Sequence, residues 1–136
     1  MTRILIVDDN PQVRTALRIC LQMHRSWNVC SEAENGQDAV ELARQLKPDI
    51  ILLDYAMPNM NGLQAAKLIS ASMPECGLIL FTMFASDQLR TLAQAAGVRT
   101  VVSKDVGVVD AIIQAIEQIR REGNPSNQTP VGARPT

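Results

Sequence analysis

The feature that most constrains the fold is a set of short, continuous apolar runs. The strong runs are residues 4–7, 50–53 and 78–81, and weaker runs are residues 27–30 and 100–102. Continuous apolar residues, in contrast to alternating ones, are typical of strands that are buried on both faces of a parallel sheet. The runs therefore predict a parallel sheet that is covered on both sides.

The segments between these runs have helical periodicity. Asn10 is a candidate N-cap for the first helix, and Pro11 suits its first position. The apolar stripes consist of Val13, Leu17, Cys20 and Leu21; Ala39, Val40, Ala43 and Leu46; Leu63, Ala66 and Ile69; Leu89, Leu92, Ala93 and Ala96; and Val109, Ile112, Ile113, Ile116 and Ile119. Five alternating strand–helix units predict an α/β fold, a three-layer sandwich around a parallel sheet.

Length and composition limit the classes of function. The chain has 136 residues and a net charge of −1, which fit one compact domain and argue against direct binding to nucleic acid. It has no apolar run of membrane-spanning length and no signal-peptide pattern at its N-terminus. Cys20, Cys30 and Cys76 show no metal-ligand spacing and are interpreted as reduced core thiols. We expect a cytoplasmic protein.

The composition changes at the C-terminus. Residues 123–136 contain prolines, glycines and polar residues with a single isolated valine. Such a segment cannot bury enough apolar surface to offset the entropy of folding. We expect a folded domain over residues 1–122 and a flexible linker or tail over residues 123–136.

Polar residues follow four of the apolar runs. Asp8 and Asp9 follow the first, Asp54 follows the run at 50–53, and Thr82 and Lys104 follow the last two. In an open parallel sheet, ligands bind outside the carboxyl ends of the strands. These side chains are therefore expected to meet at one edge of the sheet.

Their chemistry indicates a phosphoryl site. Three carboxylates in one crevice repel one another unless a cation joins them, and an all-oxygen donor set without His or Cys favours Mg²⁺. A metal ion, an ammonium and a hydroxyl can together bind the three oxygens of a phosphoryl group. Asp54 would then be a carboxylate nucleophile.

Each residue also has a simpler interpretation. Asp8 and Asp9, like Asn10, can serve only to cap the following helix. Thr82 can be a satisfied hydroxyl at a strand end, and Lys104 a solvated surface lysine. The functional interpretation is favoured because all of these residues fall at the same sheet edge.

The sequence resembles the receiver domain of bacterial two-component response regulators, over about residues 2–122. The motifs that carry the resemblance are ILIVDD from residue 4, GQDA from residue 36, KPDIILLD from residue 47, MPNMNG from residue 57, FT from residue 81 and SK from residue 103. It implies a flavodoxin-like (βα)5 fold with a five-stranded parallel sheet in the order 2-1-3-4-5. The motifs are most similar to those of regulators with a helix-turn-helix output domain.

The resemblance also implies roles for the site residues. Asp54 would be the phosphoacceptor and, with Asp9 and the backbone carbonyl of Ala56, a ligand of Mg²⁺. Asp8 would act on the metal ion through a coordinated water. The resemblance therefore implies Mg²⁺ as the cofactor of this site.

The remaining implied roles concern transfer and switching. Lys104 would pair with the phosphoryl oxygens, and Thr82 would move toward them and transmit the switch. The donor would be the phosphohistidine of a sensor histidine kinase or phosphotransfer protein. The surface between Ser86 and Arg121 would bind a second copy or an effector, in the control of transcription. The domain would be a switch and not an enzyme, apart from its own phosphorylation and dephosphorylation.

Three residues depart from the family pattern. Met83 stands where a small residue usually follows the switch threonine. Val101 replaces the usual Tyr or Phe, and Asp105 replaces the proline after the lysine. Because a cis bond to a non-proline residue is costly, we expect a trans peptide before Asp105. These departures motivate an alternative function, a receiver-like interaction module that acts independently of phosphorylation.

Other α/β classes fit less well. A haloacid-dehalogenase-type phosphatase needs a second aspartate two residues after the nucleophile, where Ala56 stands. A cobalamin-binding domain needs a histidine in the loop that follows, and a dinucleotide-binding domain needs a glycine-rich first turn. The sequence has neither.

Overall fold

The central sheet is parallel and has five strands within the described residues. The computed structural model describes residues 1–105 and 107–122, so the predicted linker or tail at 123–136 lies outside the described residues. The strands are β1 (Thr2–Val7), β2 (Trp27–Ala33), β3 (Ile50–Asp54), β4 (Gly77–Thr82) and β5 (Thr100–Ser103). Their order is β2-β1-β3-β4-β5, which confirms the predicted topology.

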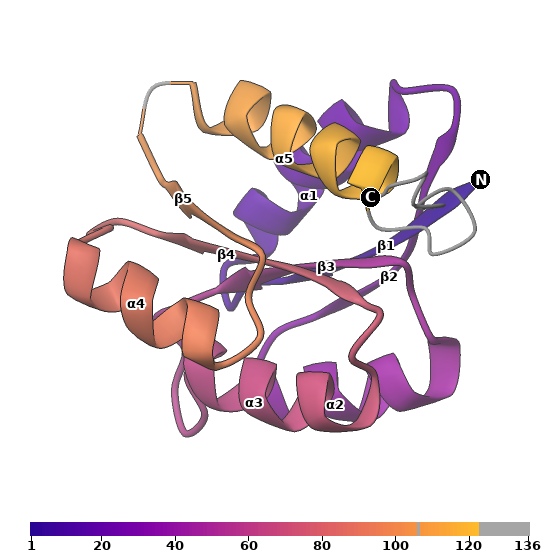
Figure 1. Cartoon of the computed structure of the whole chain (residues 1–136). Coiled ribbons are helices and arrows are strands. Elements are labelled where there is room, and N and C mark those ends of the chain that lie inside the picture. Colours follow the sequence, from indigo (N-terminus) through magenta and orange to yellow (C-terminus); the bar gives the residue numbers. More distant parts are fainter. Residues whose placement is uncertain (106, 123–136) are drawn as a thin grey trace, which may run out of the picture.

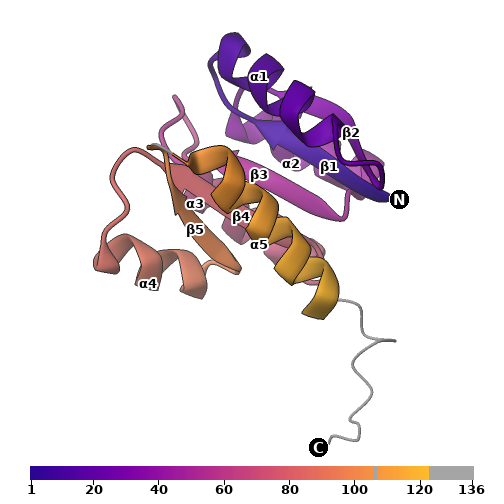
Figure 2. The same ribbon diagram turned by 90° about the horizontal axis from the view of Figure 1, so that it is seen from above.

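Helices cover both faces of this sheet. They are α1 (Pro11–Gln22), α2 (Gly36–Leu46), α3 (Gly62–Ser72), α4 (Asp87–Ala95) and α5 (Val108–Glu122). Figure 1 shows α1 and α5 on one face and α2, α3 and α4 on the other, and Figure 2 shows α1 and α5 lying over the strands. The predicted three-layer α/β sandwich is confirmed.

Alternate residues of each strand face opposite helical layers. On β1, Ile4 and Ile6 belong to the cluster under α1 and α5, whereas Leu5 and Val7 belong to the cluster under α2, α3 and α4. All residues of β3 and β4 are buried. This burial on both faces is why their sequences are continuous apolar runs.

The helix boundaries follow local signals. The Asn10 side chain accepts hydrogen bonds from the backbone N–H groups of Gln12 and Val13, and Pro11 occupies the first turn. After α4, Gly97 adopts a φ of 95°, a conformation that favours glycine and ends the helix. Among the helices that the structure describes, none is both long and apolar enough to cross a lipid bilayer.

Two predictions about burial are wrong. The helical period predicts Leu92 in the apolar stripe of α4, but this residue is 50% exposed, because Leu89 and Ala93 form the side of α4 that faces the sheet. The thiols are all free, but only Cys76 is buried, whereas Cys20 and Cys30 are half-buried. Burial raises the pKa of the Cys76 thiol to about 12, with a further contribution from the charge of Asp49.

Candidate functional site

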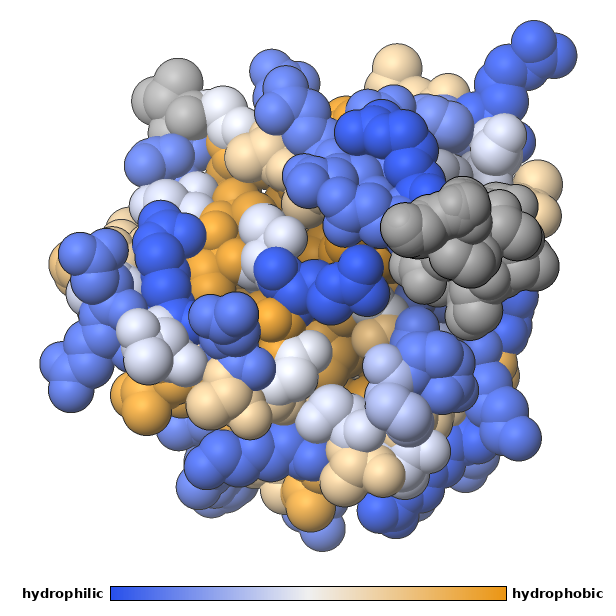
Figure 3. All heavy atoms as spheres, in the orientation of Figure 1, coloured by the Kyte–Doolittle hydropathy of each residue, from blue (hydrophilic) through white to orange (hydrophobic). Residues whose placement is uncertain are grey.

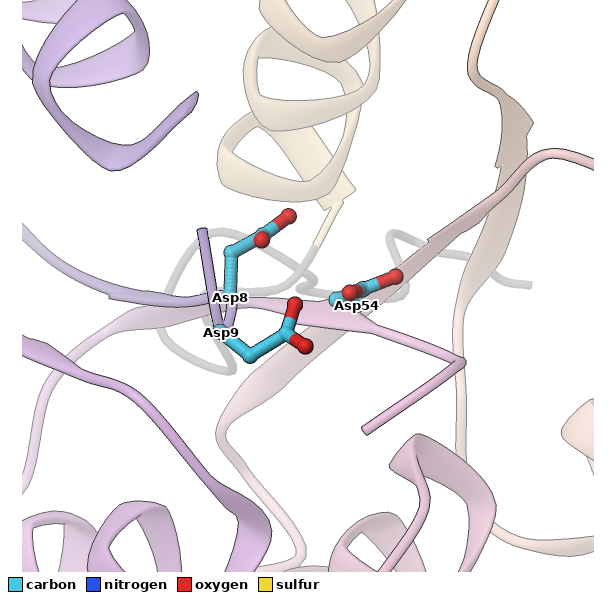
Figure 4. A group of neighbouring side chains, drawn as sticks. All are labelled: Asp8, Asp9 and Asp54. Carbon is cyan, nitrogen blue, oxygen red and sulfur yellow. The ribbon is translucent and has the colours of Figure 1, made fainter. Parts of the chain in front are cut away.

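The carboxyl ends of the strands bring the predicted site residues together. Asp8 and Asp9 directly follow β1, Asp54 is the last residue of β3, and Lys104 directly follows β5. Because β1 and β3 are neighbours in the sheet, the first three side chains meet in one space beyond their ends, as Figure 4 shows. Residues distant in sequence thus share one site.

Three carboxylates form the centre of this site. One carboxylate oxygen each from Asp8, Asp9 and Asp54 lie within 4.8 Å of one another. Asp8 and Asp54 are almost fully buried, at 1% and 3% exposure, whereas Asp9 is exposed. Such a group of oxygen donors suits a hard divalent cation that keeps part of its water shell.

Lys104 is the positive partner of the two buried carboxylates. Its Nζ atom lies 2.9 Å from Oδ1 of Asp54 and 3.2 Å from Oδ2 of Asp8. The same ammonium lies 4.7 Å from the centre of the Phe81 ring. The backbone N–H of Lys104 donates to the carbonyl of Thr82 at 2.7 Å. The interpretation of Lys104 as a solvated surface lysine is therefore excluded.

The charges in this pocket shift the pKa values of both partners. Burial raises the pKa of Asp54 and the charge of Asp8 raises it further, while the hydrogen bond from Lys104 opposes the increase. Burial by itself would lower the pKa of Lys104, but its hydrogen bond to Asp54 and the charges of Asp54 and Asp8 raise that pKa above its ordinary value. The ammonium therefore stays charged and partly balances the carboxylates.

In the turn from β1 into α1, the residue that caps the helix differs from the residues that form the acidic site. Asn10 caps α1, so capping does not account for Asp8 and Asp9. Oδ1 of Asp8 accepts a hydrogen bond from the backbone N–H of Asn10 at 2.8 Å, while its other oxygen faces Lys104. Asp8 is thus held by bonds at both oxygens.

The loop after β4 holds the hydroxyl of Thr82. Thr82 is buried, and its Oγ1 accepts a hydrogen bond from the backbone N–H of Phe84 at 3.2 Å. In this state Thr82 is a satisfied hydroxyl at a strand end, as its simpler interpretation predicts. Phe84 itself is 84% exposed, and Met83 is exposed beside it.

The loop after β3 closes against the strand end. The backbone N–H of Gly62 donates to the carbonyl of Tyr55 at 2.9 Å. A Cβ atom on Gly62 would lie 2.6 Å from the backbone carbonyl oxygen of Asp54, so only glycine fits here. The backbone N–H of Ala56 lies 3.4 Å from Oδ1 of Asp54, and the ligand role of the Ala56 carbonyl stays a prediction.

These residues surround a pocket of about 380 Å³. It is lined by Asp8, Asp9, Asn10, Val13, Asp54, Tyr55, Ala56, Thr82, Met83, Phe84 and Lys104. The departures from the family pattern are distributed around it. Met83 lines it, Val101 is half-buried against the core, and Asp105 borders a different hollow between β5 and α5. The peptide bond before Asp105 is trans, as expected.

Sequence reasoning did not find two contributors to this site, Arg14 and Glu32. The side chain of Arg14 donates to the backbone carbonyl of Asp8 and to Oε1 of Glu32. The sequence offers only a weak signal, an arginine one turn after the N-cap, because its partner on β2 lies 18 positions away.

The family model of the response regulator receiver domain matches residues 4–122. The transcriptional regulatory protein LnrK of Bacillus subtilis is 36% identical over 123 residues, which cover 90% of this chain and 56% of LnrK. The response regulator GacA of Pseudomonas aeruginosa is 34% identical over 119 residues, covering 88% of this chain and 55% of GacA. The chain thus spans about half the length of these curated relatives.

Solved structures have the same fold. A LuxR-family two-component response regulator from Aurantimonas sp. SI85-9A1 superposes with a TM-score of 0.84 at 29% identity, covering 93% of each chain. The response regulator domain of CheB from Thermotoga maritima gives a TM-score of 0.79 at 29% identity and covers 89% of this chain and 95% of that domain. With the acidic pocket at the sheet edge, these matches show that the chain belongs to the response regulator receiver domain family.

Proposed function

We propose that this receiver domain accepts a phosphoryl group on Asp54 from the phosphohistidine of a sensor histidine kinase or phosphotransfer protein. The observation that carries the proposal is the buried Asp54 carboxylate, 2.9 Å from the Lys104 ammonium and grouped with two further carboxylates. A buried carboxylate beside a fixed cation is both a nucleophile and a site that accommodates the negative charge of the product.

The donor set fits Mg²⁺. Asp9, Asp54 and the backbone carbonyl of Ala56 are the proposed direct ligands, and Asp8 acts through a coordinated water. The fit is supported by three carboxylate oxygens within 4.8 Å of one another, and no His or Cys of the described residues joins this group. When bound, Mg²⁺ supplies the positive charge that offsets the carboxylates and the transferred phosphoryl group.

The residues of the chain have separate roles in the transfer. A carboxylate oxygen of Asp54 forms the new bond to phosphorus while the phosphorus–nitrogen bond of the phosphohistidine breaks. The imidazole leaves with the electron pair of that bond. Lys104, already held between Asp54 and Asp8, stays beside the reacting oxygens and pairs with the phosphoryl group.

The switch would begin at Thr82. Its hydroxyl now accepts from the backbone N–H of Phe84, and in the phosphorylated state it would turn and donate to a phosphoryl oxygen. That rotation releases the Phe84 N–H and rearranges the loop between β4 and α4. Val101 has no ring to reorient, so the loop would transmit the change in place of an aromatic residue.

The proposed output surface lies between Ser86 and Arg121, on α4, β5 and α5. Figure 3 shows apolar side chains exposed where β5 runs between α4 and α5. Hollows on both sides of β5, of about 620 and 370 Å³, could receive side chains of a second copy or of an effector. The name of LnrK, a transcriptional regulatory protein, supports an output in transcriptional control, which would be exerted in the cytoplasm. Another relative is a protein-glutamate methylesterase, so an enzymatic output elsewhere in the full protein is compatible with this domain.

The test is intact-mass analysis after incubation with Mg²⁺ and acetyl phosphate. We expect the wild type to gain one phosphoryl group and the Asp54→Asn variant to gain none, and chelation of Mg²⁺ to prevent the gain. Asp49→Asn, at the opposite sheet edge, is the matched control and should be modified normally. If the wild type gains no mass, the proposal fails and the phosphorylation-independent interaction module is favoured.

A further inference from the structure

Arg14 joins the acidic turn to the edge strand of the sheet. It lies in the first turns of α1 and its side chain is only 16% exposed. One guanidinium nitrogen, Nη1, donates to the backbone carbonyl of Asp8, and Nε donates to Oε1 of Glu32 on β2 at 3.1 Å. The planar guanidinium has its donors in a fixed fork, so these two bonds determine its orientation together.

Glu32 is in turn fixed from its other side. Its second oxygen, Oε2, accepts from Nε of Arg18 at 2.8 Å. Each oxygen of this carboxylate therefore bonds one arginine of α1. Arg14 and Arg18 share this partner and carry the same charge, but the contact to Asp8 belongs to Arg14.

The hydrogen bond from Arg14 to the Asp8 carbonyl lies directly beside Asp9 in the backbone. The carbonyl of Asp8 belongs to the peptide group that precedes Asp9, and the N–H of Asn10 belongs to the peptide group that follows it. Arg14 holds the first, and Oδ1 of Asp8 holds the second at 2.8 Å. The side chain of Asp9 is exposed, but these two bonds fix the peptide groups on both sides of it.

We propose that Arg14 is a positioning residue of the acidic site, which holds the Asp8–Asp9 peptide so that the Asp9 carboxylate joins those of Asp8 and Asp54. This inference rests on the proposed function, because it assigns the three carboxylates to a divalent cation. Groups that orient metal ligands without touching the metal change its affinity by about 10–100-fold.

Charge and position have opposite consequences at this residue. Removing a positive charge near three carboxylates makes the site more negative and, by Coulomb attraction alone, tightens the binding of a cation. Releasing the Asp8 carbonyl lets the turn move and weakens binding. The direction of the change in Mg²⁺ affinity therefore separates a positioning role from a purely electrostatic one.

The experiment compares Arg14→Gln with Arg18→Gln. Both variants remove one positive charge and one ion pair with Glu32, but only the first loses the bond to Asp8. Mg²⁺ alone is titrated against each protein, with backbone amide NMR as the readout, and urea unfolding without Mg²⁺ measures stability. We expect about tenfold weaker Mg²⁺ binding for Arg14→Gln and a change of about twofold or less for Arg18→Gln. The amide signals of Asp9 and Asn10 should shift without Mg²⁺ in Arg14→Gln only.

The other outcomes overturn the inference. Unchanged or tighter Mg²⁺ binding in Arg14→Gln would show that the bond to Asp8 does not position the site. Equal weakening in both variants would assign the effect to the ion pairs with Glu32. If wild type binds no Mg²⁺, the proposed function loses its metal site. The amide shifts of Asp9 and Asn10 without Mg²⁺ then decide the positioning role, and their absence refutes it.

Discussion

Similar charged residues lie at the carboxyl ends of the strands, the carboxyl edge of the sheet, and at their amino ends, the amino edge. The negative charge is balanced by positive partners at the amino edge and is in excess at the carboxyl edge. At the carboxyl edge, the carboxylates of Asp8, Asp9 and Asp54 lie together, and the ammonium of Lys104 pairs with Asp8 and Asp54. At the amino edge, Asp49 precedes β3. It accepts a hydrogen bond from the backbone N–H of Arg3 at 2.8 Å and lies 3.7 Å from Nη1 of Arg120, and is 34% exposed.

The difference shows how a fold separates structural charges from functional ones. At the amino edge, each oxygen of Asp49 has a positive or N–H partner, and solvent screens the ion pair, so it adds little to stability. At the carboxyl edge, burial limits the screening of Asp8 and Asp54, and the three carboxylates outnumber the ammonium of Lys104. A divalent cation can relieve that imbalance, and this is why the proposed metal site lies at the carboxyl edge.

The largest difference between the edges should appear in phosphorylation. Lys104→Met removes the cation that pairs with Asp54, and we expect phosphorylation by acetyl phosphate to slow by about 100-fold or more, the usual effect of losing a preorganised charge partner. Arg120→Met removes the cation that pairs with Asp49 at the amino edge and should leave the rate unchanged. Rates are measured by intact-mass time courses. Equal rates in wild type and Lys104→Met would contradict the role of the ammonium.

The next largest difference concerns the glycines at the two edges. A Cβ atom on Gly62 would meet the backbone oxygen of Asp54 at 2.6 Å, whereas one on Gly77 would meet the side-chain atoms Cδ1 of Ile50 and Cγ2 of Ile119 at 2.8 Å. Side-chain methyl groups can shift more easily than a strand backbone. We expect Gly62→Ala to lower the free energy of unfolding by about 2–3 kcal/mol and Gly77→Ala by about 1 kcal/mol.

Urea unfolding monitored by circular dichroism measures both variants. A larger loss for Gly77→Ala than for Gly62→Ala would show that the loop after β3 adapts more easily than the core beneath α5.

Mg²⁺ should stabilise the domain through the carboxyl edge alone. A cation that binds only the folded state at ten times its dissociation constant raises the free energy of unfolding by about 1.4 kcal/mol. We expect most of this gain to disappear in Asp9→Asn and to persist in Asp49→Asn. Thermal unfolding with and without Mg²⁺ measures it, and an equal loss in both variants would assign the effect to nonspecific screening.

The smallest expected effect is the pH dependence due to Asp54. Its pKa is raised in the folded state, so the folded protein binds this proton more tightly than the unfolded chain does. Stability from this group is therefore present at low pH. It is lost as pH rises from the ordinary aspartate value through the raised value. Without Mg²⁺, the wild type should lose stability relative to Asp54→Asn over this interval.

Urea unfolding of both proteins at several pH values tests this dependence. A gain of stability relative to Asp54→Asn as pH rises would show that Lys104 outweighs the burial of the carboxylate.

Local signals were sufficient for most of the fold. The apolar runs predicted the strands because these are buried on both faces, and Asn10 with Pro11 predicted the start of α1. Leu92 was misplaced, because the helical period predicts a stripe but not how far the partner surface extends beneath it. The grouping of the aspartates at one edge followed from the parallel topology, whereas the contacts of Arg14 and Glu32 could not be predicted.

By itself, the sequence determined the order and type of the elements and the candidate chemistry of Asp8, Asp9, Asp54 and Lys104. These depend on local periodicity and on the rule that parallel strands end at a common edge. Only the tertiary structure decided which carboxylates are buried, which oxygen each partner contacts and what holds the turn around Asp9. Those properties depend on distances between segments far apart in the chain, which are set by side-chain packing.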